Sequence, residues 1–364
     1  MKKLLLSWLT FSLLTVLVQA QPLNPHFPAI DSARTLVEAF MDKTDIPGAS
    51  VTVMIDGRIV WSEGFGFADL ELQTPVRAGL TKFRVGSVSK PITAAALGVL
   101  HDQGKIDLDA PIQQYVPSFP EKRGKVTLRL LGGHLAGIRH YRGDEFLSAR
   151  RYNSVDEGLE IFAADTLLFM PGTDYQYSSY GWNLISAAIE QAADTNFLTY
   201  VDQVVFSPLG MTNTAPDYTD SLVLHRSRFY TTTDDGRVIN APYVDNSYKW
   251  AGGGFVATTD DLARFANAHL EPGYLSVSTL ETWLQPQQKS NGESTGYGIG
   301  WRQRDDDHGH TWVGHSGGSV GGITQMIAYP EHKVVVSMLT NSDEVQYGEV
   351  HHQIAHLFFP EPVD

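Results

Sequence analysis

The segment FRVGSVSKPITAAA, residues 83–96, decides how this chain of 364 residues is interpreted. It places Ser87 and Lys90 three residues apart, at the start of a helix that the sequence predicts over 91–103. Side chains at this spacing lie one turn apart on the same helix face. A serine hydroxyl is a poor nucleophile unless a base accepts its proton, and a lysine amine can do so once burial or nearby cations lower its pKa. The segment therefore predicts a nucleophile with its own base, although an N-cap serine beside a solvated lysine has the same pattern.

Strand signals lie at both ends of the chain, and helical signals lie between them. Apolar runs at 49–55 and 58–64 enclose Asp56-Gly57, a dipeptide typical of a two-residue hairpin turn. Further strands are predicted at 297–303, 323–329 and 333–340, and helices at 31–44, 91–103, 127–131, 155–164, 181–193, 197–206, 258–270 and 345–358. The two ends then share one sheet. The predicted fold class is α/β (α+β): an antiparallel sheet flanked by N- and C-terminal helices, with an inserted, mostly helical lobe.

The composition excludes several classes of function. The net charge is −14, and so acidic a chain lacks the Lys and Arg stripes with which proteins bind nucleic acid or anionic membranes. The chain contains no Cys, which rules out disulfides, Cys-ligated zinc, iron–sulfur clusters and a cysteine nucleophile. We therefore expect no nucleic-acid partner.

The first twenty residues have the pattern of a secretory signal peptide. Lys2 and Lys3 precede an apolar run over 4–18, and Val18-Gln19-Ala20 has the small residues of a cleavage site. Cleavage after Ala20 leaves residues 21–364, in which no second long apolar run occurs, so we expect no stable membrane insertion of the mature chain. These features predict a periplasmic or secreted protein, with an uncleaved N-terminal anchor as the alternative.

Two further motifs accompany the serine and the lysine. The segment PGTDYQYSS, 171–179, contains Tyr177 and Ser179, and GHSGG occupies 314–318. In this order the three motifs resemble the Ser-x-x-Lys, Tyr-x-Asn and His-x-Gly elements of the serine β-lactamase and penicillin-binding-protein superfamily, in its class C-like branch, peptidase family S12. The stretches 137–141 and 241–255 are most similar to the β-lactamase-like proteins of animal mitochondria and their bacterial homologues. Several ordered elements are far more specific than any single motif.

The resemblance implies a β-lactamase/transpeptidase-like fold and an acyl-enzyme mechanism that needs no metal or organic cofactor. It assigns Ser87 as the nucleophile and lets Lys90 and Tyr177 share the role of base, because a cation beside the phenol lowers the pKa of the phenol. The positions that bind substrate or form the oxyanion hole are Ser179, His315, Ser316, Gly317 and Gly318. The hole itself is expected from the backbone N–H groups of Ser87 and Gly318. The resemblance also implies a sheet lobe of about 31–85 and 297–364 and a helical lobe of about 86–296.

Two residues depart from the pattern of that superfamily. Ser179 stands in place of the Asn of Tyr-x-Asn and offers a shorter hydrogen-bonding group. His315 stands in place of the Lys of Lys-Thr-Gly, so a fixed positive charge for a substrate carboxylate becomes pH-dependent. Both changes weaken the case for efficient β-lactam hydrolysis, and the resemblance to the animal branch implies instead a peptidase or esterase that acts on small peptides, amides or esters. A β-lactamase or D-Ala-D-Ala carboxypeptidase is the alternative activity, and the resemblance also makes a homo-oligomer worth testing.

Three other interpretations remain open at this stage. GHSGG also matches the G-x-S-x-G nucleophile elbow of α/β-hydrolases, with Asp343 and His352 following in the expected order. A metal site could draw on His352 and His356 with Glu349, or on the acidic stretch 305–310, although neither has the His-Glu-x-x-His spacing. The third is a non-catalytic penicillin-binding-like sensor or self-assembling scaffold, against which the intact serine, lysine and tyrosine argue.

Overall fold

The two ends of the chain meet in one antiparallel sheet. The computed structural model describes residues 24–343 and 345–360. Its largest sheet has seven strands in the order β3-β2-β1-β12-β11-β10-β9. Their bounds are β1 (Gly48–Ile55), β2 (Arg58–Asp69), β3 (Thr74–Pro75), β9 (Arg302–Asp305), β10 (Thr311–Ser319), β11 (Gly322–Tyr329) and β12 (Val334–Thr340). The N-terminal hairpin β1–β2 pairs with β12, so the predicted fold class is confirmed.

The hairpin has the turn that its sequence predicts. Asp56 and Gly57 both have positive φ, 46° and 74°, which is the geometry of a type I′ turn. In this turn the strands leave with the right-handed twist of the sheet. Nearly every residue of β1 and β12 is buried, without the usual alternation of buried and exposed side chains. The reason is that both faces of the sheet are covered at its centre.

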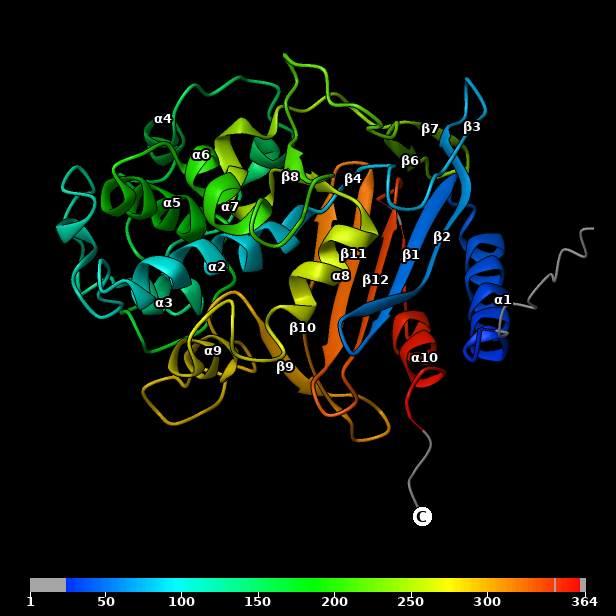
Figure 1. Cartoon of the computed structure of the whole chain (residues 1–364). Coiled ribbons are helices and arrows are strands. Elements are labelled where there is room, and N and C mark those ends of the chain that lie inside the picture. Colours follow the sequence, from blue (N-terminus) through cyan, green and yellow to red (C-terminus); the bar gives the residue numbers. More distant parts are fainter. Residues whose placement is uncertain (1–23, 344, 361–364) are drawn as a thin grey trace, which may run out of the picture.

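Helices cover both faces of the sheet. On one face lie α1 (Phe27–Thr44) and α10 (Val350–His356), which enclose a core of residues such as Val37, Val336 and Ile354. On the other face lie α8 (Thr259–Asn267) and, beyond it, the remaining helices (Figure 1). Those helices are α2 (Ser89–Asp102), α3 (Leu128–Gly132), α4 (Val155–Leu159), α5 (Tyr180–Ala193), α6 (Phe197–Val201), α7 (Trp250–Gly253) and α9 (Val277–Leu284).

The helix α2 runs through the middle of the helical part. Eleven of its fourteen residues are buried, and the run Ala94-Ala95-Ala96 lets α5 and α7 approach closely. A small three-stranded sheet, β4 (Phe83–Arg84), β8 (Phe255–Ala257) and β5 (Ala215–Pro216), fixes the chain just before this helix. The pair β6 (Tyr230–Thr232) and β7 (Val238–Asn240) lies farther out. The start of α2 is therefore held firmly on two sides.

Some predicted boundaries differ from the structure. The strand predicted over 297–303 is mostly a turn region, since β9 begins only at Arg302 and Gly300 has a φ of 79°. The helix predicted over 345–358 is shorter, with α10 spanning Val350–His356. The division into a sheet lobe and a helical lobe stays a prediction, and α8, inside the predicted helical range, packs on the sheet through Thr259. The predicted signal peptide lies outside the described residues.

Candidate active site

Ser87 lies where the sheet meets the helical part. It belongs to a single 3-10 turn, Gly86–Val88, that leads directly into α2. Strand β10 passes immediately beside this turn: a Cβ atom added to Gly86 would lie 2.5 Å from the carbonyl oxygen of Gly318. Gly86 also has a φ of 50°, a left-handed conformation that favours glycine. The backbone thus brings Ser87 and Gly318 together, as the predicted oxyanion hole requires.

The Lys90 amine lies within hydrogen-bonding distance of three groups at the base of the site. Its Nζ lies 3.0 Å from Ser87 Oγ, 3.0 Å from Ser179 Oγ and 2.6 Å from the carbonyl oxygen of Gly252. The Lys90 side chain is fully buried. Burial, with the nearby cations Lys249 and Arg302, holds the pKa of Lys90 well below its ordinary value. The structure therefore places an amine with a reduced affinity for protons next to the predicted nucleophile.

Tyr177 lies against the same pair of residues, but not with the pKa that we expected. The Lys90 Nζ lies 4.9 Å from the centroid of the Tyr177 ring, and the Tyr177 phenol interacts with the Ser87 hydroxyl. Burial raises the pKa of Tyr177 above its ordinary value, and the contributions of Ser87 and Arg302 do not reverse this. The predicted lowering of this pKa is wrong, because desolvation of the phenolate outweighs the nearby cations.

His315 is a buried, neutral partner of Tyr297. Only 1% of its surface is exposed, and its Nε2 lies 2.9 Å from the Tyr297 hydroxyl. Burial, with Lys90 and Arg302 nearby, holds the pKa of His315 well below its ordinary value. The predicted pH-dependent charge at this position is therefore absent near neutral pH. Arg302 on β9 supplies the cation instead, with its guanidinium carbon 6.0 Å from the Tyr177 ring centroid and 5.6 Å from that of Tyr297.

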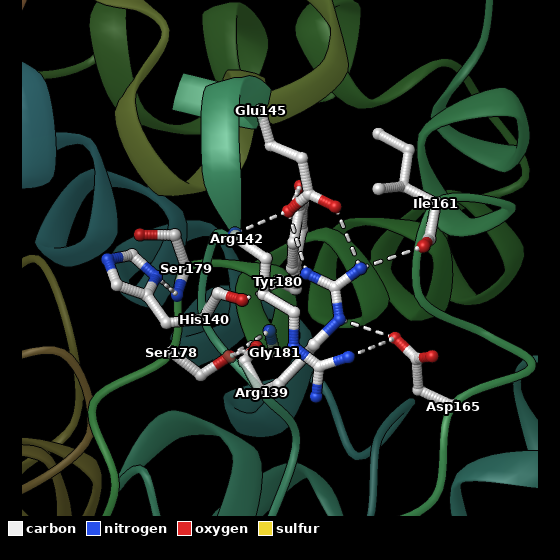
Figure 2. A network of polar contacts seen from close by, with 10 residues as sticks. All are labelled: Arg139, His140, Arg142, Glu145, Ile161, Asp165, Ser178, Ser179, Tyr180 and Gly181. Carbon is white, nitrogen blue, oxygen red and sulfur yellow. Dashed lines mark hydrogen bonds and ion pairs between the residues drawn. The ribbon is translucent and has the colours of Figure 1, made fainter. Parts of the chain in front are cut away.

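A network of hydrogen bonds around Arg139 fixes the loop that contains Arg139 and His140 and that faces Ser179 (Figure 2). The Arg139 guanidinium donates to both oxygens of Glu145, at 2.7 and 2.9 Å, and also to Asp165 and to the carbonyl oxygen of Ile161. The carbonyl oxygen of Arg139 in turn accepts from Ser178 Oγ at 2.7 Å. The network thereby ties the loop to the N-terminus of α5.

The same loop brings the His140 ring next to Ser179. The backbone N–H of Ser179 donates to His140 Nδ1 at 3.2 Å, and Figure 2 shows the ring beside Ser179. Burial lowers the pKa of His140 to about 4, so the ring is neutral near pH 7. Because Nδ1 accepts this bond, we assign the ring proton to Nε2. The imidazole is therefore a hydrogen-bond donor beside Ser179.

A cavity of about 400 Å³ opens beside Ser87. Its lining residues are Ser87, His140, Tyr141, Phe146, Ser179, Lys249, Gly252, Gly253, Gly318, Ser319, Ile323 and Asp343. Of the predicted positions, Ser87, Ser179 and Gly318 line this cavity, whereas His315, Ser316 and Gly317 lie farther back along β10. His140, Lys249 and Arg302 are not among the site residues predicted from the sequence. The first two fall in stretches that resemble relatives but that carry no residue with a predicted role.

Two of the alternative interpretations can be judged from this geometry. Ser316 lies within β10 and pairs with Gln325 of β11, not at a turn from strand to helix, so the nucleophile-elbow interpretation is wrong. Near the C-terminus, His356 Nε2 lies 2.7 Å from Asp306 Oδ2, which also accepts from the Tyr329 hydroxyl. Within residues 24–343 and 345–360, no three His, Asp or Glu side chains are placed to hold a metal ion together.

The comparison with protein families agrees with this arrangement. The family profile described as Beta-lactamase matches residues 33–357. The chain belongs to the β-lactamase family. The members of this family are mostly serine hydrolases.

Curated members of the β-lactamase family resemble the chain over most of its length. "Serine beta-lactamase-like protein LACTB, mitochondrial" of Bos taurus is 32% identical and covers 86% of this chain and 74% of the relative. "Penicillin-binding protein 4*" of Bacillus subtilis is 28% identical and covers 91% of this chain and 76% of the relative. The predicted periplasmic or secreted location is contradicted by these comparisons, since the animal relatives, at 31% to 32% identity, are named as mitochondrial proteins.

Solved structures show the same fold. A D-stereospecific amidohydrolase from Streptomyces has a TM-score of 0.76 at 23% identity, covering 89% of this chain and 98% of that one. An octameric penicillin-binding protein homologue from Pyrococcus abyssi also has a TM-score of 0.76 at 23% identity, covering 90% and 77%. These likenesses concern the fold alone. In the part of the chain that the structure describes, no helix is long and apolar enough to cross a membrane.

Proposed function

We propose that the chain is a serine hydrolase that forms an acyl-enzyme on Ser87 and acts on small peptides, amides or esters. The observation that carries the proposal is the 3.0 Å distance between Ser87 Oγ and the Nζ of the fully buried Lys90. A buried amine with a lowered pKa is the group that a serine hydroxyl needs in order to become a nucleophile.

The hydrogen bonds of Lys90 suit a neutral amine. Such an amine has two hydrogens, which it can donate to Ser179 Oγ and to the carbonyl oxygen of Gly252. Its lone pair is then free to accept the proton of Ser87 Oγ. The serine oxygen attacks the substrate carbonyl carbon, a C–O bond forms, and the negative charge moves to the carbonyl oxygen. The backbone N–H groups of Ser87 and Gly318 would stabilise that oxyanion.

The phenol of Tyr177 can complete the proton transfers. Because burial raises its pKa, Tyr177 keeps its proton and can donate it to the leaving group as the tetrahedral intermediate collapses. Lys90, now carrying the serine proton, can restore the phenol. Water then attacks the acyl carbon while Lys90 accepts one of its protons, the ester bond to Ser87 breaks, Lys90 returns the proton to Ser87 Oγ, and the acid product leaves. None of these steps needs a cofactor.

The departures from the Tyr-x-Asn and Lys-Thr-Gly motifs favour peptidase or esterase activity. Ser179 is engaged by Lys90, and His315 is neutral, so neither offers the groups that recognise a β-lactam in the pattern of the superfamily. Relatives named as an amidohydrolase and as a penicillin-binding protein support hydrolysis of amide-like bonds. A β-lactamase or D-Ala-D-Ala carboxypeptidase is the second activity to test, and a non-catalytic scaffold is the outcome if no turnover depends on Ser87.

Turnover by the wild type and by Ser87→Ala tests the proposal. A panel of para-nitrophenyl esters, dipeptide amides and nitrocefin should show ester or amide hydrolysis that falls by about three orders of magnitude or more in Ser87→Ala, with unchanged circular dichroism. Ser118→Ala, which replaces an exposed serine, is the matched control. Equal turnover by the wild type and Ser87→Ala would remove the proposal, and turnover of nitrocefin alone would favour the β-lactamase.

A homo-oligomer is the remaining proposal about partners. The Pyrococcus neighbour is described as octameric, which is compatible with self-assembly of this fold. Light scattering after size-exclusion chromatography gives the mass of the particle directly. A mass near 40.2 kDa, that of one chain, at all concentrations would contradict self-assembly.

A further inference from the structure

Lys249 is a buried cation beside the nucleophile, and no polar partner contacts it in the part of the chain that the structure describes. It lies in the 3-10 turn Asn246–Lys249, directly before α7, and only 2% of its surface is exposed. Among residues 24–343 and 345–360, none forms a hydrogen bond or ion pair with its Nζ. Instead the ammonium lies over three aromatic rings, 4.1 Å from the centroid of Phe146, 5.1 Å from Tyr248 and 5.3 Å from Tyr141. A lysine is almost never fully buried unless it is paired, so this arrangement needs a reason.

Two carboxylates of the described residues, Asp217 and Asp343, could balance the charge of Lys249, and neither forms an ion pair with it. Asp217 accepts from Arg84 at 2.7 Å and from Arg226 at 3.0 Å, so its charge is already balanced. Asp343 also lines the cavity: its Oδ2 accepts from the backbone N–H of Gly321 at 2.8 Å, its Oδ1 has no partner among the described residues, and it forms no ion pair with Lys249. Within residues 24–343 and 345–360 the positive charge of Lys249 therefore lacks an ionic partner and is available to an anion that enters the cavity.

His140 presents a second donor in the same cavity. Its Nδ1 is occupied by the backbone N–H of Ser179, and its Nε2–H has no hydrogen-bond acceptor among the described residues. The Lys249 cation is close enough to contribute to the lowered pKa of His140. An ammonium and an imidazole N–H that line one cavity form a site for an anionic oxygen group.

The direction of β10 shows which part of a substrate reaches these donors. Tyr177, the proposed proton donor to the leaving group, lies near His315 and Arg302, with ring centroids of Tyr177 and His315 6.3 Å apart. From His315 the strand runs past Ser87 to Gly318 and Ser319, and only the latter two line the cavity. The leaving group therefore departs on the His315 side, and the acyl part extends towards Lys249.

We infer that Lys249, assisted by His140, binds a carboxylate carried by the acyl part of the substrate. This inference rests on the proposed hydrolase and adds its substrate class: acyl groups that end in a carboxylate a few bonds from the scissile carbonyl. Lys249 is then a specificity-determining residue, which in addition helps to hold the pKa of Lys90 below its ordinary value. The aromatic rings hold its ammonium in place when the cavity is empty, and the carboxylate replaces the missing ionic partner when substrate binds.

Paired substrates that differ only in charge test this inference. The para-nitrophenyl monoesters of glutaric and adipic acid are compared with the same esters in which the free carboxylate is a carboxamide, a neutral group of the same shape. Burial lowers the pKa of Lys249 to about 7, so the assays use slightly acidic buffer, in which the ammonium is present. Ser87→Ala gives the spontaneous hydrolysis that is subtracted.

We expect the wild type to prefer the carboxylate in kcat/KM by about 10- to 100-fold, which is the size of a charge-assisted hydrogen bond, and to show the preference mainly in KM. Lys249→Met should bring the ratio of carboxylate to carboxamide close to one, while Lys249→Arg, which keeps the charge, should retain much of it. Lys333→Met, which removes a half-exposed lysine on the loop between β11 and β12, is the control for net charge and should leave the ratio unchanged.

The outcomes that contradict the inference can be told apart from those that contradict the proposed function. If the wild type hydrolyses carboxylate and carboxamide substrates with the same kcat/KM, and hydrolysis still depends on Ser87, the inference about Lys249 is wrong and the proposed hydrolase function is unaffected. Lys249→Met with the wild-type ratio of carboxylate to carboxamide, whatever the loss of kcat on both substrates, would show that the residue does not bind the carboxylate. Hydrolysis that does not depend on Ser87 would remove the proposed function itself.

Discussion

At the scale of single residues, the functional question is which group accepts the proton of Ser87. Lys90 and Tyr177 are both close to Ser87, but desolvation shifts their pKa values in opposite directions. Removing water disfavours the charged form of either group, so it lowers the pKa of an amine and raises that of a phenol. Lys90 is therefore the base and Tyr177 the proton donor in our account.

This assignment predicts a clear pH dependence. Because neutral Lys90 is required, kcat/KM should fall as pH drops through the lowered pKa of Lys90 and should level off above it. Lys90→Met should lose about 10²–10⁴-fold in kcat, and Lys90→Arg should lose as much because arginine stays protonated. Initial rates of hydrolysis measured over a range of pH give the dependence of kcat/KM on pH, with Lys122→Met as the control. A Lys90→Arg variant with wild-type turnover would contradict the role of a neutral base.

The sequence could predict the residue types at this site but not their charges. The spacing of Ser87 and Lys90 follows from local sequence, and the resemblance supplied Tyr177 and His315. The neutral state of His315 depends on its complete burial beside Tyr297, which is 18 positions away. Likewise, no local pattern shows that Lys249 lies under three aromatic rings. Tertiary burial sets these charges, and a sequence read alone does not reveal it.

At the scale of elements, the contact between β10 and the turn before α2 shapes the site. A Cβ atom added to Gly317 would lie 2.0 Å from the carbonyl oxygen of Val85 and 3.0 Å from the backbone nitrogen of Ser87. Added to Gly318, it would meet only Ile323 Cδ1 at 3.7 Å. The two neighbouring glycines thus serve different purposes, since only the first is required by close packing.

The difference between these glycines is a testable prediction. Gly317→Ala should lower the free energy of unfolding by about 1–3 kcal/mol, because β10 must move away from the turn, and the displaced Gly318 N–H should cost about 10²–10³-fold in kcat. Gly318→Ala should have a melting temperature close to that of the wild type. Calorimetry and ester hydrolysis measure both effects. Equal melting temperatures for the two variants would show that β10 does not press on the turn.

The elements themselves followed from the sequence where their signals were local. The Asp56-Gly57 turn, the strands on either side of it and the helix after Ser87 all lie within a few residues of their predicted positions. The predicted strand 297–303 failed because Gly298 and Gly300 let the chain fold back: a Cβ on Gly298 would lie 2.1 Å from the carbonyl oxygen of Trp283. A close approach to a distant segment of this kind is not readable from periodicity.

At the scale of the whole molecule, buried histidines link stability to pH. His134, His269 and His315 are each at most 2% exposed, and burial lowers the pKa of all three, to about 4 for His269. The unfolded chain, with histidine pKa values of about 6.5, then binds more protons than the folded one. The neutral buried histidines therefore contribute their full stabilisation above a pH of about 6.5. This contribution to the free energy of unfolding is lost progressively as the pH falls below that value.

His269 offers the cleanest test of this link. Each such histidine contributes about 1.4 kcal/mol per pH unit below its unfolded pKa. His269→Phe should flatten the slope of the unfolding free energy against pH by about that amount, since its neighbours Phe265 and Trp301 accept an apolar ring and its Nε2 has no partner in the described part of the chain. Urea unfolding at several pH values measures the slope. His225→Asn, an exposed position, is the control, and an unchanged slope in His269→Phe would contradict the link.

The proposed function depends on a Ser87 nucleophile that Lys90 activates. Labelling with a fluorophosphonate, followed by mass spectrometry of the modified peptide, identifies such a nucleophile. We expect a single phosphonyl adduct on Ser87 of the wild type, little adduct in Lys90→Met, and none in Ser87→Ala. Labelling of another serine, or labelling of Ser87 at the same rate after the lysine is removed, would contradict these roles of Ser87 and Lys90.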